Sequence, residues 1–133
     1  QIPAGKVSAQ VGITMDLTAS ILAATRTPVP ADTRLDGIDL MPVLQGRAPE
    51  VERTLFWRIT SRSQYAVRSG DWKFLSDGGR PMLFNVRKDL AERTNLIGER
   101  ADIARRLVPL LDVWLADVDD EASVLVLDSL LSL

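Results

Sequence analysis

Two groups of residues are candidates for contact with a charged ligand: three cationic side chains, and a polar connector that is the stronger candidate of the two. Alternation of apolar and polar residues predicts that Arg58, Arg68 and Lys73 project from one face of a small β-sheet, and a cationic face could attract an anionic substrate. The polar connector between the first two predicted strands adds two further candidates, Arg62 and Gln64. In a second interpretation the cations are solvated or ion-paired, and the connector is polar because it is a surface turn.

Catalytic groups of the common kinds are missing, because the sequence contains no histidine and no cysteine. Thiol nucleophiles, imidazole acid–base catalysis, Ser-His-Asp triads and Cys/His zinc sites all require these side chains. Asp32, Asp36 and Asp39 surround Gly37, but they lack the alternating carboxylates and distal Glu of a calcium loop, so turn and cap roles explain them better. We expect no catalytic residue and no metal site in this chain.

The composition excludes several kinds of partner. The 133 residues are 46% hydrophobic and 26% charged, as in ordinary globular proteins. The net charge of -2 provides no basic field for nucleic acid, and no apolar run reaches the roughly 20 residues of a membrane span. The chain begins without Met and without a signal-peptide pattern, so we expect it to start inside a longer protein.

The first part of the chain, residues 1–50, is predicted to be a linking segment that contains one helix and one short helical turn. Apolar residues at helical spacing predict a helix over about residues 15–24, started by the Thr14 hydroxyl. This helix is apolar on most sides and should pack against more protein than its immediate neighbours offer. Asp39 should cap a short helical turn over residues 40–45.

The middle of the chain predicts a four-stranded antiparallel meander. Its strands cover residues 54–59, 64–68, 71–76 and 81–86, and their connectors are too short for crossovers. Alternation assigns six apolar residues to the face opposite the cations: Leu55, Trp57, Tyr65, Val67, Trp72 and Phe74. The tryptophans on this face, and Trp114, are interpreted as core residues rather than as a sugar-stacking platform.

A helix over about residues 101–118 should cover the apolar face, because its apolar residues form a stripe at helical spacing. Pro109 should kink or break this helix, and the acidic residues 117–121 should end it. Asp89 and Glu92 are spaced as a capping box and predict a tight turn. The fold class is therefore α+β, with a subdomain at 51–122 and an apolar tail at 123–133.

Five segments follow one another in a recognisable order: PAGKVSAQVGITMDLTASIL, LDGIDLMPVLQG, RTLFWR, YAVRSGDWKFL and LFNVRKDLAERTNL. They closely resemble the C-terminal part of the sulfatase family, over residues 1–118. The resemblance implies an alkaline-phosphatase-like α/β domain upstream and a small sheet packed on a C-terminal helix. The chain departs from the family at Ala19-Ser20, where Pro-Thr is usual, and at Asp89-Leu90, where Asp-Pro is usual.

The resemblance also implies a function. In sulfatases the nucleophile is a formylglycine in a Cys/Ser-x-Pro-x-Arg motif, and a calcium ion binds the sulfate; the chain has no such motif. We therefore expect a non-catalytic scaffold that forms part of the substrate-cleft wall of a sulfate-ester hydrolase. Its implied partners are the upstream catalytic domain and a sulfated small molecule or sugar.

Two alternatives remain open at this point. The parent could be a related phosphomonoester or phosphonate hydrolase, or the chain could be a freestanding protein-interaction module. The isolated fragment is also expected to self-associate through its apolar first helix and tail.

Overall fold

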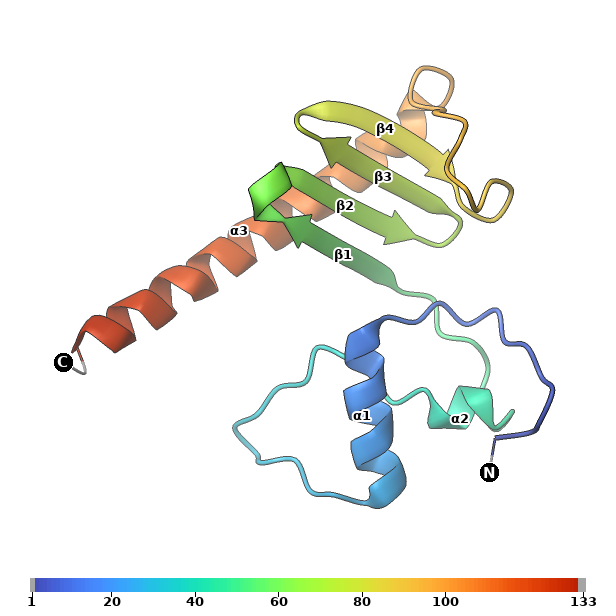
Figure 1. Ribbon diagram of the computed structural model, residues 1–133, viewed down its shortest axis with the longest axis vertical. Helices are drawn as coiled ribbons and strands as arrows, with labels where there is room; N and C mark the ends of the chain where they lie inside the picture. The colour runs from blue at the N-terminus through green and yellow to red at the C-terminus, as the bar shows by residue number, and fades with distance from the viewer. Residues whose placement is uncertain (1, 132–133) are drawn as a thin grey trace. The chain divides into compact units, whose positions relative to one another are not determined.

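The chain, described here by a computed structural model, divides into two compact units (Figure 1), one of residues 1–53 and one of residues 54–133. The structure describes residues 2–131, and it describes side chains up to residue 120. The two units are considered separately below.

The first unit contains the two predicted helices, α1 (Thr14–Thr25) and α2 (Met41–Leu44). The predicted start of α1 was wrong in one respect: the N-cap is Ile13, and Thr14 lies inside the helix. The carboxylate of Asp16 accepts a hydrogen bond from the Ile13 N–H at 2.8 Å. Asp16 thus reaches back from the first turn to the N-cap, as the acidic member of a capping box does, and the Thr14 hydroxyl is not needed.

The segment that leads to α2 is held against α1 by its backbone. Asp16 accepts a hydrogen bond from the Ile38 N–H at 3.0 Å, and the Ser20 hydroxyl accepts one from the Leu40 N–H at 2.9 Å. A Cβ on Gly37 would lie 2.2 Å from the Met15 carbonyl oxygen, so only glycine fits this approach. The N-cap of α2 is Leu40, so the prediction that Asp39 caps this turn was wrong, although the Asp39 carboxylate accepts a 2.8 Å hydrogen bond from the Met41 N–H.

The same buried carboxylate carries an ion pair. Arg53 Nη1 lies 2.7 Å from Asp16 Oδ2, and the Asp16 side chain is only 1% exposed. Burial opposes ionisation, but hydrogen bonds from Arg53 and from the Ile38 and Ile13 N–H groups outweigh it, so the pKa of Asp16 lies below its usual 3.8. Because α1 is almost uncharged in the sequence, no role was predicted for its one acidic residue, Asp16.

The second unit begins with the predicted meander. Strands β1 (Thr54–Ile59), β2 (Gln64–Ser69), β3 (Trp72–Asp77) and β4 (Arg80–Asn85) form one antiparallel sheet in the order β1-β2-β3-β4. A short 3-10 turn, η1 (Thr60–Arg62), joins β1 to β2. The prediction of a four-stranded antiparallel sheet is confirmed.

The predicted faces of β1 were wrong. Phe56 pairs with Val67 and Val67 pairs with Phe74, so Phe56 and Arg58 share the face of these core residues. Leu55 and Trp57 lie instead on the face of Arg68 and Lys73. Alternation within β1 was correct, but the turn at η1 sets its register against β2, and a change of one residue in register reverses every side chain.

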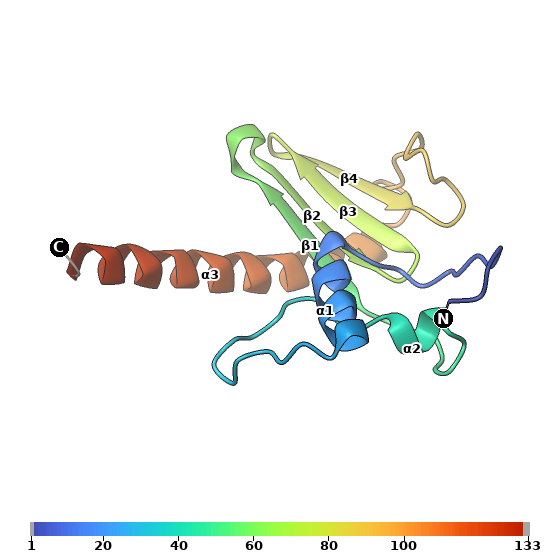
Figure 2. The ribbon, with the colours of Figure 1, turned by 60° about the horizontal axis from the view of Figure 1, so that its bottom comes forward.

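Helix α3 (Ala101–Leu131) lies across one face of the sheet, as Figures 1 and 2 show. This is the face on which the Val67 side chain packs against the helix. The buried core joins three strand residues to three helix residues: Val67, Phe74, Leu83, Ala104, Leu107 and Leu111. Phe56 also stacks on Trp114, with ring centroids 5.2 Å apart. The prediction that a C-terminal helix covers the sheet is confirmed.

Helix α3 has neither the break predicted at Pro109 nor the end predicted at residues 117–121. The helix runs through Pro109 without a break and continues past the acidic residues 117–121. Pro109 removes one hydrogen-bond donor, but Leu107 and Leu111 on either side are anchored in the core. The unfavourable charges cost only about 0.3–1 kcal/mol each, too little to end a helix alone. The side chains of the predicted apolar tail, 123–133, lie outside the described part.

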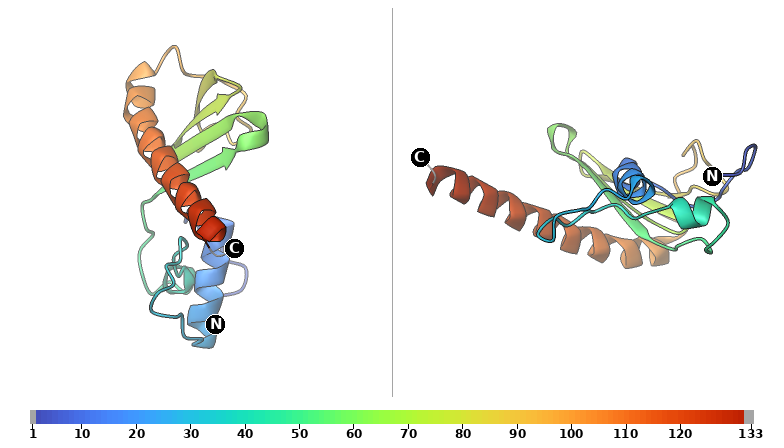
Figure 3. Two further views of the ribbon diagram at one scale, coloured as in Figure 1. Left: turned by 90° about the vertical axis from the view of Figure 1, so that its left-hand side faces the viewer. Right: turned by 90° about the horizontal axis from the view of Figure 1, so that it is seen from below.

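The helix is longer than the sheet that it covers. Its 31 residues span about 46 Å, whereas a six-residue strand spans about 20 Å. Figure 3 shows the C-terminal part of α3 extending beyond the sheet.

Candidate functional site

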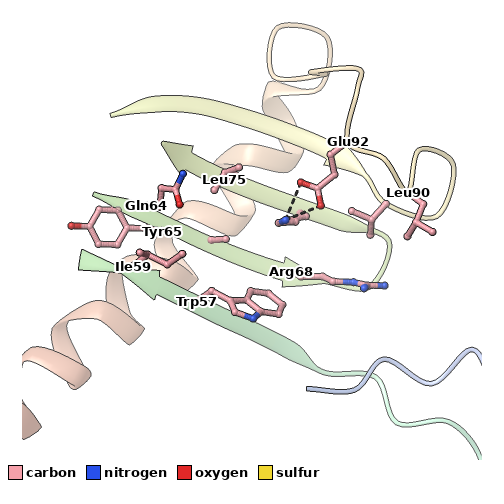
Figure 4. Close-up of a pocket in the computed structure, with 11 residues that line it drawn as sticks. Trp57, Ile59, Gln64, Tyr65, Arg68, Leu75, Leu90 and Glu92 are labelled. Atoms are coloured by element: carbon pink, nitrogen blue, oxygen red, sulfur yellow. Dashed lines mark hydrogen bonds and ion pairs between the residues drawn. The ribbon is translucent and has the colours of Figure 1, made fainter. Parts of the chain in front are cut away.

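The face of the sheet opposite α3, called here the outer face, carries an open hollow of about 410 Å³. Figure 4 shows its lining side chains, which come from β1, β2 and β3 and from the segment after β4. They are mostly apolar with a few polar groups: Trp57, Ile59, Gln64, Tyr65, Ala66, Arg68, Lys73, Leu75, Val86, Leu90 and Glu92. Such a combination is typical of ligand-binding hollows.

A tight turn after β4 supplies one wall of the hollow. Asp89 Oδ2 accepts hydrogen bonds from the N–H groups of Arg93 and Thr94, each at 2.8 Å, which confirms the predicted turn. The capping role predicted for Glu92 was wrong, because α3 begins only at Ala101 and no helix end lies nearby. Glu92 adopts a left-handed backbone conformation, with φ of 54°.

The Glu92 carboxylate holds Lys73 in the hollow (Figure 4). Lys73 Nζ lies 2.7 and 2.9 Å from its two oxygens. Both side chains are partly exposed, so the pair stabilises the fold by no more than about 1 kcal/mol. Lys73 is therefore ion-paired, as the second interpretation of the cationic residues proposed.

Arg68 is the other cation of the hollow. Its Nε donates a hydrogen bond to the Gly70 carbonyl at 3.2 Å, which fixes the base of the guanidinium. Trp57 lies diagonally across from it on β1, on the same face. Gln64 is held by Asp77, since its Nε2 donates to the Asp77 carboxylate at 2.8 Å.

The remaining two predicted contact residues do not reach the hollow. Arg58 lies on the α3 face, and its Nη1 is 2.5 Å from Asp119 Oδ1. Arg62 is exposed on η1 and does not line the hollow. The structure therefore brings together Gln64, Arg68 and Lys73, while contact of any of the five with a substrate stays a prediction.

Sequence reasoning assigned two members of the hollow to other roles. Trp57 was assigned to the core because the phase of β1 was reversed, and Glu92 was assigned to a helix cap. Asp89 alone accepts the hydrogen bonds from the N–H groups of Arg93 and Thr94, so this turn does not need the Glu92 carboxylate as a cap. That arrangement leaves the Glu92 carboxylate available to another partner.

Comparison with curated proteins identifies sulfatases. The chain is 46% identical over 57 residues to N-acetylgalactosamine-6-sulfatase of Sus scrofa, covering 42% of this chain and 10% of that protein. It is 44% identical over 73 residues to the Canis lupus familiaris enzyme of the same name, covering 55% of this chain and 14% of that protein. No protein-family model matches the chain.

Solved structures share the fold. A protein in complex with its substrate D-glucosamine-2-N,6-O-disulfate superposes with a TM-score of 0.67 and 21% identity, over 90% of this chain and 27% of that one. A 2-O GAG sulfatase gives a TM-score of 0.59 and 24% identity, over 79% of this chain and 25% of that one.

The meander and the long helix share the fold of about a quarter of the length of these two solved structures. The resemblance to the sulfatase family is thereby confirmed, and the curated relatives that the chain matches carry the name N-acetylgalactosamine-6-sulfatase. The chain spans only about a tenth to a seventh of their length. In the part that the structure describes, no helix is both long and apolar enough to cross a membrane.

Proposed function

We propose that the chain is the C-terminal part of a sulfatase and that its parent protein hydrolyses sulfate esters. The observation that carries the proposal is the 46% identity over 57 residues to a sulfatase, of which the match covers 10%. The sequence has no histidine and no cysteine, so imidazole and thiol chemistry must come from other parts of the parent. The chain then acts as a non-catalytic scaffold.

The calcium ion and the formylglycine implied by the resemblance belong, in this proposal, to the upstream catalytic domain. The residues described here do not fit a metal site, because no group of three or more carboxylates among them is arranged to hold an ion. Calcium prefers six to eight oxygen ligands. No step of sulfate hydrolysis is therefore assigned to this chain.

The hollow on the outer face serves, in this proposal, as part of the wall that faces a sulfated sugar. Arg68 offers a planar guanidinium, which can bind two oxygens of a sulfate at once. Trp57 beside it offers an apolar ring surface for the sugar. Lys73 contributes less, because Glu92 neutralises it at 2.7 Å.

The test uses the full-length gene product and compares its hydrolysis of a 6-sulfated N-acetylgalactosamine with that of aryl sulfate and aryl phosphate. Arg68→Ala should raise KM for the sulfated sugar about tenfold, the equivalent of one charged hydrogen bond, with little change in kcat. Arg80→Ala is the matched control, since Arg80 is exposed on β4 and does not line the hollow.

Two outcomes would replace this proposal. Preference for the phosphate ester would indicate the phosphomonoester or phosphonate hydrolase alternative. A native reading frame that starts at Gln1 would indicate the freestanding interaction module instead. An unchanged KM in Arg68→Ala would remove only the hollow from the substrate cleft.

A further inference from the structure

The sheet has one open edge in its β1 strand. The Ser63 carbonyl accepts a hydrogen bond from Gly78 on the β3 side, at 3.2 Å. Alternation along β2 then directs the backbone groups of Ala66 toward β1, where Ala66 pairs with Trp57. The N–H and C=O groups of Phe56 and Arg58 therefore face away from β2, at the edge of the sheet.

The opposite edge, on β4, is closed. Leu83 N–H donates to the Asn95 side-chain oxygen at 3.0 Å, and the Leu83 carbonyl accepts from the Leu96 N–H at 2.8 Å. Pro81 has no N–H to offer. The contrast matters because natural sheets usually protect their edges with proline, charge or a covering segment. Strand β1 has no proline and no covering segment within its own unit, and its one charged residue, Arg58, is paired with Asp119.

A groove runs beside this open edge, between β1 and α3. It is lined by Phe56, Leu110, Val113, Trp114, Ala116, Asp117 and Asp120. Val113 is 72% exposed and Leu110 is 41% exposed, a large apolar surface for two neighbouring helix positions. The stacked rings of Phe56 and Trp114 form its floor next to the strand.

The two ends of this groove differ in charge. Phe56, Leu110, Val113 and Trp114 make one part of it apolar, whereas Asp117 and Asp120 line the part farther along α3. Asp117 and Asp120 thus give this end of the groove a negative charge, and no ion pair of either occurs among the side chains that the structure describes. A strand added to β1 would place every second side chain over this groove.

We infer that the β1 edge and this groove bind an extended peptide as a fifth strand. The peptide carries an apolar residue over Val113 and a basic residue two positions away, beside Asp117 and Asp120. Backbone hydrogen bonds to Phe56 and Arg58 supply affinity, and the alternate side chains supply specificity. This inference does not depend on the proposed sulfatase function.

The test titrates the 133-residue chain with the synthetic peptide Thr-Lys-Thr-Val-Thr-Lys-Thr, which can pair in either direction. The control peptide replaces both Lys by Glu. Calorimetry should give at least tenfold tighter binding of the basic peptide. Amide exchange should slow at Phe56 and Arg58 but stay unchanged at Trp57, whose backbone already faces β2.

Protein variants separate the contributions. Asp117→Lys combined with Asp120→Lys should reverse the preference toward the Glu peptide, and Val113→Asp should abolish binding of both peptides without unfolding, since Val113 is exposed. Asp112→Lys is the matched control on the same helix, outside the groove, and should bind as the unaltered chain does.

Three results would overturn the inference. They are equal affinity for the two peptides, slowed exchange at residues other than Phe56 and Arg58, and protection of these two amides that grows with chain concentration in the absence of peptide. The last result would assign the edge to a second copy of the chain.

Discussion

Arg53 and Asp16 form an ion pair of 2.7 Å around a carboxylate that is 1% exposed. Asp16 accepts, in addition, the N–H groups of Ile13 and Ile38. One side chain in the first turn of α1 therefore fixes the start of that helix, the segment before α2, and the residue that precedes β1. This network explains why an otherwise apolar helix carries a single acid.

Replacing this carboxylate should strongly destabilise the first unit. Asp16→Ala leaves the mostly buried Arg53 without its partner and two backbone N–H groups without acceptors, which should lower the free energy of unfolding by about 3–5 kcal/mol. Urea denaturation measures the change. Asp36→Asn, at an exposed position, should stay within about 0.5 kcal/mol of the unaltered chain, and an equal loss in both variants would refute the role of Asp16.

The same pair predicts the pH dependence of stability. The pKa of Asp16 is lower in the folded chain than its usual 3.8, so the unfolded chain takes up the proton first as the pH falls. The stabilisation is complete above pH 3.8 and is lost as the pH falls through the folded-state pKa. Unfolding curves between neutral and strongly acidic pH should decline less steeply in Asp16→Asn, and parallel declines would contradict this explanation.

Gly37 should tolerate no side chain. Gly37→Ala places a Cβ 2.2 Å from the Met15 carbonyl oxygen, so the segment before α2 must move away from α1. Overpacking of this kind costs about 1–3 kcal/mol. Gly98→Ala is the matched control, because nothing lies within 4 Å of its added Cβ. Thermal unfolding of the two variants should differ by several degrees, and equal midpoints would show that the contact can relax.

The Lys73–Glu92 pair should limit the charge of the hollow. If the hollow faces a sulfated substrate, Glu92→Gln releases Lys73 and should lower KM of the full-length enzyme about two- to threefold at low salt, with the gain lost at high salt. Glu99→Gln, at an exposed position outside the hollow, is the control. A raised KM in Glu92→Gln would show that Glu92 itself contacts the substrate.

The meander and its covering helix were predictable because they depend on local patterns. Strand alternation, short connectors and the apolar stripe of α3 each indicate one structure without long-range information. The strand bounds of β1 agree with the structure at both ends.

What escaped prediction depends on contacts between distant residues. Both faces of the sheet carry large apolar side chains, so hydrophobicity alone could not choose between Phe56 and Trp57 for the core. Asp16 pairs with Arg53, 37 residues away, and Lys73 pairs with Glu92, 19 residues away. No spacing pattern in the sequence predicts either ion pair. Of the predicted contact residues, Arg58 was misplaced by the same reversal of β1.

The most direct test of the central claim compares sulfate release from a 6-sulfated N-acetylgalactosamine by the intact gene product and by the purified 133-residue chain. The account predicts turnover by the intact protein and none by the chain alone, because the chain has no histidine or cysteine and no group of carboxylates arranged for a metal among its described residues. Sulfate release by the isolated chain, or its absence from the intact protein, would contradict the account.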